Sequence, residues 1–423
     1  MGGEWAGEVR FGQILKHRKE RGRNDDPLLS VTQDNGVVPQ AEAGRRNISS
    51  TNKQTYWRVY PGDVVYNTMR MWQGASGCSA HFGIVSPAYT VCEPATGVLP
   101  RYVAYLLKHP DYTAKFTSRC QGLTSDVWNL KFSEFSKIHL SLPPLPEQRR
   151  IAEILDTLDA AIRKTEQVIA KLQRMKQGLL HDLLTRGIDQ HGHLRNPHTH
   201  PEQFKPSPLG KIPKEWEVVR LDQSAVEIID GDRGVHYPHG DELYKSGYCL
   251  FLSATNVTRS GFRFNTVQFI DARKDRLLGT GKLTRGDVVI TTRGTVGNIA
   301  YYDGTVPFDH VRINSGMVIL RSTEGGLDPR FLHRSLTDYI FEHEFKKVVS
   351  GSAQPQLPIR DMEQFHLMIP SPSEQRRLLS ATEGVYERLD YEEAQLAKLR
   401  LLKQGLMDDL LMGRRRVRVK GEG

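Results

Sequence analysis

The sequence has few cysteines and no long apolar run. Its 423 residues include four cysteines, which form no CxxC pair and are too sparse for a disulfide framework. No window approaches the roughly 18 consecutive apolar residues that a membrane helix needs. The first twenty residues contain no apolar core of the kind that marks a secretion signal. These absences argue against disulfide-rich, membrane-spanning and secreted proteins, and we expect a chain that works in the reducing cytoplasm.

Short catalytic and cofactor-binding motifs are missing as well. We find no phosphate-binding G-x-x-x-x-G-K-[ST] loop, no G-x-G-x-x-G after a strand, no H-E-x-x-H and no G-x-S-x-G. Four histidines lie close together, but their spacing fits no helix or strand face and no cysteine is near, which disfavours a metal site: His191, His193, His198 and His200. The sequence therefore predicts a binding component with no catalytic residues, metal or cofactor of its own.

The length of the chain predicts its number of domains, and its net charge indicates what kind of partner it binds. At roughly 100–200 residues per domain, the chain should hold two domains. Lys and Arg number 58 against 49 Asp and Glu, giving a net charge of +9, which modestly favours a polyanionic partner. The excess gathers in corresponding parts of the two halves, with eleven basic and six acidic residues in 9–70 and eight and three in 256–293.

The chain repeats itself at a constant offset. Glu-Gln-Arg-Arg at 147–150 recurs at 374–377, and Lys-Gln-Gly-Leu at 176–179 recurs at 403–406. Between 147–184 and 374–411, 15 of 38 positions are identical without a gap. This period is far longer than the roughly 20–50 residues of a solenoid repeat, so we interpret the chain as one unit built twice.

Each repeated stretch has the pattern of a long helix. Apolar residues recur at steps of three and four, which is typical of a coiled-coil seam. A helix over 147–184 would extend about 57 Å. The two helices could pair antiparallel with each other or pack separately on their own domains, and the sustained seam favours pairing. The predicted pairing residues are Leu155, Leu158, Ile162, Ile169, Leu172 and Leu179 in the first copy and Val385, Leu389, Leu396, Leu399 and Leu406 in the second.

The segments before the helices share fainter motifs in the same order. Gly-Asp-Val-Val at 62–65 recurs at 286–289, Gly-x-x-Gly at 74–77 recurs at 294–297, and Trp5 parallels Trp216. Short β-branched runs such as 288–292 and 317–320 alternate with helical stretches such as 329–347, which indicates mixed α/β domains. The shared motifs look like scaffold, and the sequence between them diverges, so the two units should bind related but different ligands.

Three phrases identify a family resemblance. They are Leu-Pro-Glu-Gln-Arg-Arg-Ile at 145–151 leading to Lys-Gln-Gly-Leu-Leu at 176–180, Gly-Lys-Ile-Pro-Lys-Glu-Trp at 210–216, and Asn-Thr-Met-Arg-Met-Trp-Gln-Gly at 67–74 with the Gly-Ile-Val-Ser-Pro that begins at 83. Together they resemble the specificity subunit of type I restriction–modification systems. The resemblance covers essentially the whole chain.

The resemblance implies a division of the chain. It predicts target recognition domains at 1–145 and 212–371, spacer helices at 146–188 and 372–412, a linker at 189–211 and a basic tail at 413–423. The helices would pair as an antiparallel coiled coil that separates the two halves of a split DNA site. The internal repeat would give the subunit pseudo-two-fold symmetry.

The resemblance also implies the partners: double-stranded DNA, two modification (methyltransferase) subunits and restriction (motor–nuclease) subunits. S-adenosylmethionine, ATP and Mg²⁺ would belong to those subunits. The subunit itself would be non-catalytic and cytoplasmic. Two departures stand out, namely a short segment before Trp5 and a less faithful second helix, in which Gly384, Tyr386 and Tyr391 replace Thr157, Asp159 and Lys164.

Base readout requires arginine, asparagine, glutamine and similar side chains, whereas phosphate contacts require positive charge. In the first domain the candidate DNA-binding residues are Arg45, Arg46, Lys53, Arg70 and Gln73. In the second they are Arg233, His236, Arg259, Arg263, Arg293 and Asn298. Each could equally be a solvated surface residue. Trp72 could stack on a base, although core packing is favoured.

The candidate contacts with the modification subunits are Arg149, Arg150, Arg376 and Arg377, for which helix-start hydrogen bonds or local ion pairs are the alternative. Three other hypotheses remain open at this point. The chain could belong to a related system that only methylates, could be a free-standing nuclease or methyltransferase, or could be a coiled-coil adaptor that binds no DNA.

Overall fold

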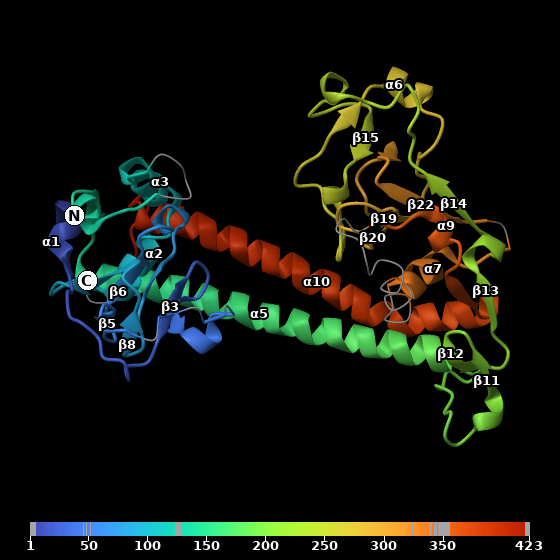
Figure 1. Ribbon diagram of the computed structural model, residues 1–423, viewed down its shortest axis with the longest axis horizontal. Coiled ribbons are helices and arrows are strands. Elements are labelled where there is room, and N and C mark those ends of the chain that lie inside the picture. Colours follow the sequence, from blue (N-terminus) through green and yellow to red (C-terminus); the bar gives the residue numbers. More distant parts are fainter. Residues whose placement is uncertain are drawn as a thin grey trace. The chain divides into compact units, whose positions relative to one another are not determined.

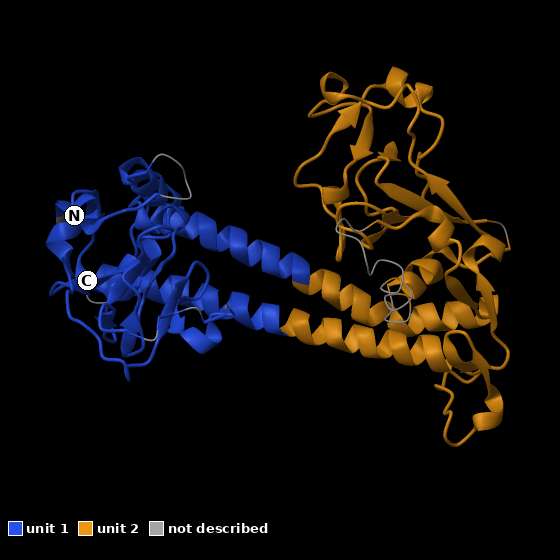
Figure 2. Ribbon diagram, viewed as in Figure 1, with its two compact units in different colours: residues 1–167, 393–423 blue, residues 168–392 orange. Residues whose placement is uncertain are grey.

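The computed structural model describes residues 6–44, 46–47, 49–50, 52–122, 128–323, 325–337, 341, 345 and 356–418. Trp5 and Arg45, and parts of 329–347 and of the tail, lie outside them. Residue contacts divide the chain into two compact units, 1–167 with 393–423 and 168–392 (Figure 2). Each unit therefore contains one globular domain and a part of each of the two long helices, α5 (Leu145–Arg186) and α10 (Pro372–Leu411). Both helices include the stretches that the periodicity predicts to be helical.

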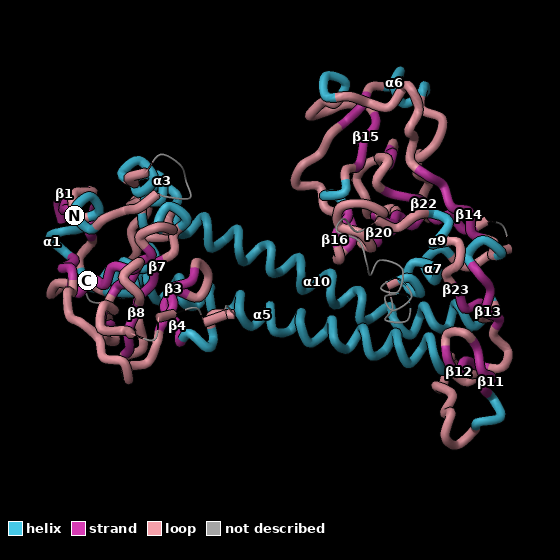
Figure 3. The backbone as a smooth tube through the Cα atoms, in the orientation of Figure 1, coloured by secondary structure: helices cyan, strands magenta, loops and turns pink. Residues whose placement is uncertain are grey.

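Both domains mix short strands with short helices, as Figures 1 and 3 show, so the mixed α/β prediction is confirmed. The strands of the first are β1 (Ala6–Arg10), β2 (Leu15–His17), β3 (Leu29–Thr32), β4 (Gly36–Pro39), β5 (Trp57–Val59), β6 (Val64–Asn67), β7 (Ser76–Cys78), β8 (Gly83–Val85), β9 (Tyr89–Pro94) and β10 (His139–Leu142). Its helices are α1 (Phe11–Ile14), α2 (Pro100–Leu106), α3 (Pro110–Arg119) and α4 (Phe132–Phe135).

The second domain has a further hairpin before it. The strands from this hairpin onward are β11 (Phe204–Ser207), β12 (Gly210–Pro213), β13 (Glu217–Arg220), β14 (Val226–Asp230), β15 (Cys249–Leu252), β16 (Val257–Thr258), β17 (Gly261–Phe262), β18 (Phe269–Ile270), β19 (Val288–Thr291), β20 (Ile299–Tyr301), β21 (Val311–Ile313), β22 (Met317–Ser322) and β23 (His366–Ile369). The helices are α6 (Ala272–Leu277), α7 (Pro329–Leu336) and α9 (Ile359–Met362).

The same sheet occurs in both domains. Four strands run in the order β2-β9-β6-β7 in the first and β14-β22-β19-β20 in the second, and all neighbours are antiparallel. A separate two-stranded sheet, β1-β10 or β13-β23, joins the start of each domain to the strand just before its long helix. The internal repeat is thus a repeat of topology as well as of sequence.

The repeated Gly-Asp-Val-Val motif builds the turn that enters the inner strands β6 and β19. Gly62 and Gly286 have φ of 93° and 101°, which side-chain-bearing residues rarely adopt. Asp63 and Asp287 are buried and accept the backbone N–H of Tyr60 and Thr284. Each carboxylate also binds an arginine, Arg18 at 2.9 Å in the first domain and Arg321 at 2.7 Å in the second. These motifs are therefore scaffold, as the sequence suggests.

Within each unit, parts of the two long helices pack against each other. In the first unit Lys403 Nζ of α10 lies 2.6 Å from Asp159 of α5, and Arg400 of α10 lies 2.8 Å from Glu166 of α5. The residue numbers of the contacting residues therefore increase along α5 while they decrease along α10. The two segments therefore run antiparallel. In the second unit apolar residues of both helices join the core of the domain: Leu179, Leu180, Leu183 and Leu184 with Leu378, Leu379 and Tyr386. All eleven predicted pairing residues are buried or half-buried.

Candidate nucleic-acid interface

A tight turn after β19 carries Arg293. Thr291 Oγ1 accepts the N–H of Asn298 at 3.0 Å, and Gly294 and Gly297 take positive φ of 74° and 88°. A side chain at Gly297 would place its Cβ 2.5 Å from the ring of Phe345, so only glycine fits. The second copy of the Gly-x-x-Gly motif therefore shapes this turn, and Arg293 is exposed on it.

Arg293 and Arg233 line one cavity of about 250 Å³ in the second unit. Arg233 is exposed and lies 3.1 Å from Asp230 and 3.4 Å from the carbonyl of Ser315. The backbone N–H of Arg293 donates to Gly316 at 3.2 Å. Two of the predicted DNA-binding arginines are thus brought together, although they lie far apart in the sequence.

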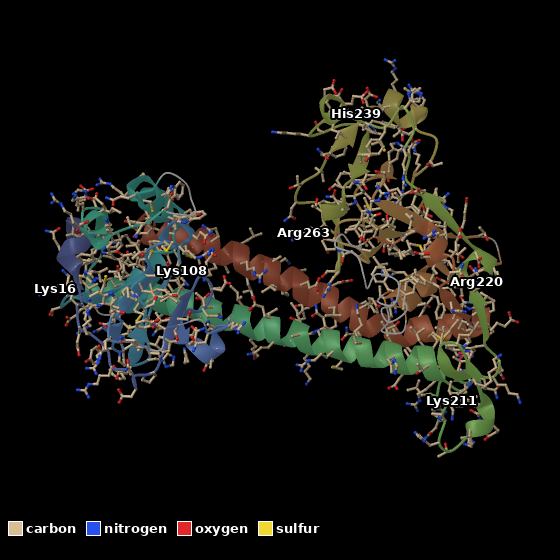
Figure 4. The ribbon with its side chains drawn as sticks, viewed as in Figure 1. Lys16, Lys108, Lys211, Arg220, His239 and Arg263 are labelled. Carbon is tan, nitrogen blue, oxygen red and sulfur yellow. The ribbon has the colours of Figure 1, made fainter. Side chains whose placement is uncertain are left out.

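The same turn also contacts the hairpin that carries two further candidates. Asn298 donates its amide to the carbonyl of Val257 in β16 at 2.9 Å. Arg259 lies in the turn of this β16–β17 hairpin and Arg263 directly after β17, and both side chains are exposed. Figure 4 labels Arg263 at the edge of the unit, well apart from His239 in that view. The amide of Asn298 therefore serves to hold the hairpin, and the arginines are the groups available to a ligand.

His236 lies on a separate, well-anchored loop. Burial alone would raise the pKa of Asp232, but Gly234 and Gly279 each donate a backbone N–H to this carboxylate at 2.7 Å and the pKa is lowered. The two hydrogen bonds to Asp232 anchor the loop, while His236 is exposed and Val235 is 92% exposed. The loop is thus held in one shape while its apex faces solvent.

The first unit carries Arg70 and Gln73 on the corresponding turn, η2 (Met71–Gln73), between β6 and β7. The two side chains lie 3.4 Å apart. The indole of Trp72 donates to Met69 and meets Trp128 edge-on at 5.5 Å, so it packs within the turn. Arg46 is exposed and Lys53 half-buried on the loop before β5, and no hydrogen bond or ion pair among the described residues joins them to Arg70 or Gln73.

The repeated Glu-Gln-Arg-Arg motif has its first two residues buried and its arginines nearer the solvent. Gln148 donates to the carbonyl of Pro143 at 2.8 Å and accepts from Leu99 N at 2.8 Å, and Gln375 does the same with Pro370 at 3.0 Å and Asp328 at 2.8 Å. Each glutamine thus ties its helix to the helix that begins at Pro100 or Pro329.

The buried glutamates of the motif bind arginines that follow the other long helix. Glu147 holds Arg416, and Glu374 holds Arg195. Sequence reasoning missed these roles, although the identity of both residues between the copies was the available signal. Of the four arginines of the motif, Arg149, Arg150 and Arg376 are exposed, Arg150 lies 3.2 Å from Glu153, and Arg377 is half-buried.

Comparison with known proteins places this fold in a family. The family model described as the type I restriction modification DNA specificity domain matches residues 25–174 and 213–401, once in each half. The chain belongs to this family, the specificity component of type I restriction–modification systems. The members of this family recognise the DNA target and assemble with methyltransferase and restriction subunits, which carry the catalytic activities.

Individual relatives agree along nearly the whole chain. It is similar to the type I restriction enzyme MjaVIII specificity subunit of Methanocaldococcus jannaschii, with 24% identity over 97% of this chain and 93% of the relative. It is 24% identical to the EcoBI specificity subunit of Escherichia coli over 85% and 74% of the two chains. The crystal structure of a type I S subunit from M. genitalium shares the fold, with a TM-score of 0.55 and 12% identity over 96% of both chains.

The part of the chain that the structure describes contains no helix long and apolar enough to cross a membrane. Within the same residues, no group of three or more His, Cys, Asp or Glu side chains is placed to hold a metal ion. The family membership sets aside the hypotheses of a free-standing enzyme and of an adaptor without a DNA role.

Proposed function

We propose that this chain recognises a bipartite DNA target, one half with each domain, in the cytoplasm. The single observation that carries the proposal is the duplicated turn, which presents Arg70 after β6 in the first domain and Arg293 after the equivalent strand, β19, in the second. Arginine is the residue that most often makes specific contacts with guanine. The residues around the two turns differ, so the two half-sites should differ in sequence.

The long helices act in this proposal as the spacer between the half-sites. Continuous pairing as an antiparallel coiled coil would make the gap a geometric property of the protein and would join two weak readouts into one tight site. The antiparallel ion pairs within the first unit support it, as does the finding that all eleven predicted seam residues are buried or half-buried.

Two modification subunits would dock on the helix pair, once in each unit. Met175 and Leu402 occupy the same repeat position, and both apolar side chains are exposed, at 51% and 52%. Three residues further on, Gly178 and Gly405 would have nothing within 4 Å of an added Cβ. Because these glycines make no close contact within the chain, an approaching partner helix explains their presence better than packing inside this protein.

A hollow of about 630 Å³ in the first unit adds to this docking face. It is lined by Ile154 and Leu158 of α5 and Leu406 of α10, with the predicted contact residue Arg150 at its edge. Leu406 is one helical turn from Leu402 on the same helix face. The repeat counterparts of these residues are also apolar: Ala381, Val385 and Leu179, with Met175 in place of Leu402.

The DNA proposal is tested with the complex of this chain and its modification subunit. Sequencing of methylated bases in a host that expresses both should give a bipartite motif with an unspecified gap. We then expect Arg70→Ala to weaken discrimination at one half-site and Arg293→Ala at the other, by about 1–3 kcal/mol each. A continuous motif, or loss of discrimination in the same half-site for both variants, would contradict the proposal.

The docking proposal has a stoichiometric test. Native mass spectrometry should find two modification subunits on the wild-type chain, one on Met175→Glu or Leu402→Glu, and none on the double variant. Gln167→Glu, an exposed change on the same helix, is the matched control and should keep both subunits. Two bound subunits on the double variant would place the docking face elsewhere.

A further inference from the structure

Two buried glutamates begin the repeated helices, and each binds a segment that follows the other helix. Arg416, just beyond the end of α10, donates to Glu147 through Nε at 2.7 Å and Nη2 at 2.6 Å. Glu374 accepts from Arg195 at 2.6 Å and from the backbone N–H of Ile188 at 2.9 Å, both in the segment after α5. We refer to these two contacts as the first and second clasp.

Both clasps are built into the fold. The side chains of Glu147 and Glu374 are each 3% exposed, whereas ordinary surface ion pairs lie in water. At the second clasp Gly187 has φ of 66°, and an added Cβ would lie 2.5 Å from the Glu374 carboxylate and 2.9 Å from Trp216. The chain therefore turns after α5 in the one way that brings Ile188 and Arg195 onto Glu374.

The clasps and the helices form a closed circuit with two nearly equal sides. One side runs from Glu147 along α5 to Ile188, and the other runs from Glu374 along α10 to Arg416, which is longer by a single residue. Each clasp lies within one unit, and each side is helical along nearly its whole length, up to Arg186 in α5 and Leu411 in α10. Sliding one helix along the other would therefore require a clasp to open.

An apolar seam by itself resists such sliding weakly. Apolar side chains recur every three or four residues, so a slip of one turn brings leucines opposite leucines again. Buried polar pairs add little net stability, because their desolvation opposes their attraction, and their best-attested use is to specify register. Two buried Glu–Arg clasps at the ends of a leucine seam fit this use.

We propose that Glu147 and Glu374 are positioning residues that fix the axial register of α5 against α10 and thereby the length of the gap between the two DNA half-sites. The inference rests on the bipartite recognition proposed above. A slip of one turn moves a helix by about 5.4 Å, which corresponds to roughly one and a half base-pair steps of about 3.4 Å. A released clasp should therefore admit targets whose gap differs by one or two base pairs.

The test uses the complex with its modification subunits and DNA duplexes that differ only in the gap, from two base pairs shorter to two longer. We expect the wild type to methylate its native gap about 100-fold faster than any other. In Glu147→Gln with Glu374→Gln, the native-gap rate should stay within about threefold and the rate on neighbouring gaps should rise about tenfold, because the seam still holds the helices together.

Glu166→Gln is the matched control. It removes a carboxylate that bonds the same pair of helices, to Arg400 at 2.8 Å, but both partners are far more exposed than the clasp glutamates, and the gap profile should stay as sharp as that of the wild type. Should the double variant not fold, Arg416→Gln opens the first clasp from its more exposed side and should broaden the profile in the same way.

The outcomes separate the two claims. A profile that stays sharp in the clasp variants, or a loss of rate that is equal at every gap, would overturn the register role and leave a merely structural one. A wild-type complex that methylates a continuous motif would instead refute the bipartite recognition on which the inference rests.

Discussion

The amide of Gln148 should be one of the more costly side chains to remove from the first unit. It is 1% exposed and makes three hydrogen bonds, donating to Pro143 O at 2.8 Å and Gly97 O at 3.2 Å and accepting from Leu99 N at 2.8 Å. Gln148→Ala would leave these backbone groups without their partner in a site that water reaches poorly. The change also removes one buried methylene group, worth about 0.8 kcal/mol, so most of the expected loss comes from hydrogen bonding.

The magnitude follows from the groups left unpaired. Each unsatisfied buried donor or acceptor costs about 1–3 kcal/mol, and the part-buried N–H of Leu99 lies at the low end. We therefore expect a loss of about 3 kcal/mol, which raises the local opening equilibrium of α2 by about two orders of magnitude. Because a chain of two units need not unfold in one step, the opening is best measured locally.

Hydrogen–deuterium exchange of the α2 amides is the assay. These amides should exchange about 100-fold faster in Gln148→Ala, whereas those of α7 in the second unit should be unchanged. Gln177→Ala is the control, because Gln177 recurs in the second copy just as Gln148 does but is exposed. Equal acceleration of α2 by both variants would refute the reasoning, since identity between the copies and not burial would then govern the effect.

Three further predictions concern other parts of the chain. Gly187→Ala should destabilise the second unit by more than about 1 kcal/mol in thermal unfolding, because Gly187 has a positive φ and lies in the crowded space beside Glu374. Gly178→Ala should instead stabilise the isolated chain by about 1 kcal/mol and weaken docking of the modification subunit. Truncation after Leu411 removes Arg416 and the part-buried Val417, so proteolysis should find the first unit opened and the second intact. Burial, with Lys176 and Arg334 nearby, lowers the pKa of His333 to about 4. Between about pH 6.5 and 4 only the unfolded chain takes up this proton, so the free energy of unfolding should fall as the pH drops through that range. In His333→Gln the urea concentration at the unfolding midpoint should depend less on pH over the same range.

The long helices and the duplication were predictable because both depend on local pattern. A stripe of apolar residues at steps of three and four specifies a helix and its buried face without knowledge of what covers it. The constant, gapless offset between the copies then relates the second helix to the first. The β-branched runs at 288–292 and 317–320 likewise formed β19 and β22, since such runs suit a buried sheet whatever their neighbours.

The roles of the motif residues could not be predicted, because they depend on segments distant in sequence. No sequence motif near Glu147 indicates that Arg416 will bind it, and a charged residue in a helix is by default expected at the surface. The DNA candidates show the same limit. Arg233 and Arg293 line one cavity because β22 pairs with β14 on one side and with β19 on the other, whereas Arg46 and Lys53 lie on a loop that the described contacts do not connect to Arg70.

The second helix departs from the first at Tyr386, and the structure shows how the departure is compensated. In the first unit Lys403 lies 2.6 Å from Asp159 and 5.5 Å from the ring centroid of Tyr105, which projects from α2. In the second unit the aromatic ring is on the long helix instead, because Tyr386 stands at the position of Asp159.

Arg334 takes the position of Tyr105, at the same distance from the proline that begins its helix. Lys176, the counterpart of Lys403, then lies 4.6 Å from the Tyr386 ring and Arg334 lies 3.9 Å from it. The aromatic ring is thus on the short helix in the first unit and on the long helix in the second, and the charged side chain beside it is on the other helix in each case. The lysine stays at the same repeat position. Since each lysine adjoins an exposed docking residue, Met175 or Leu402, the exchange leaves the proposed docking faces alike, and the two modification subunits should bind with similar affinity despite the divergence of the helices.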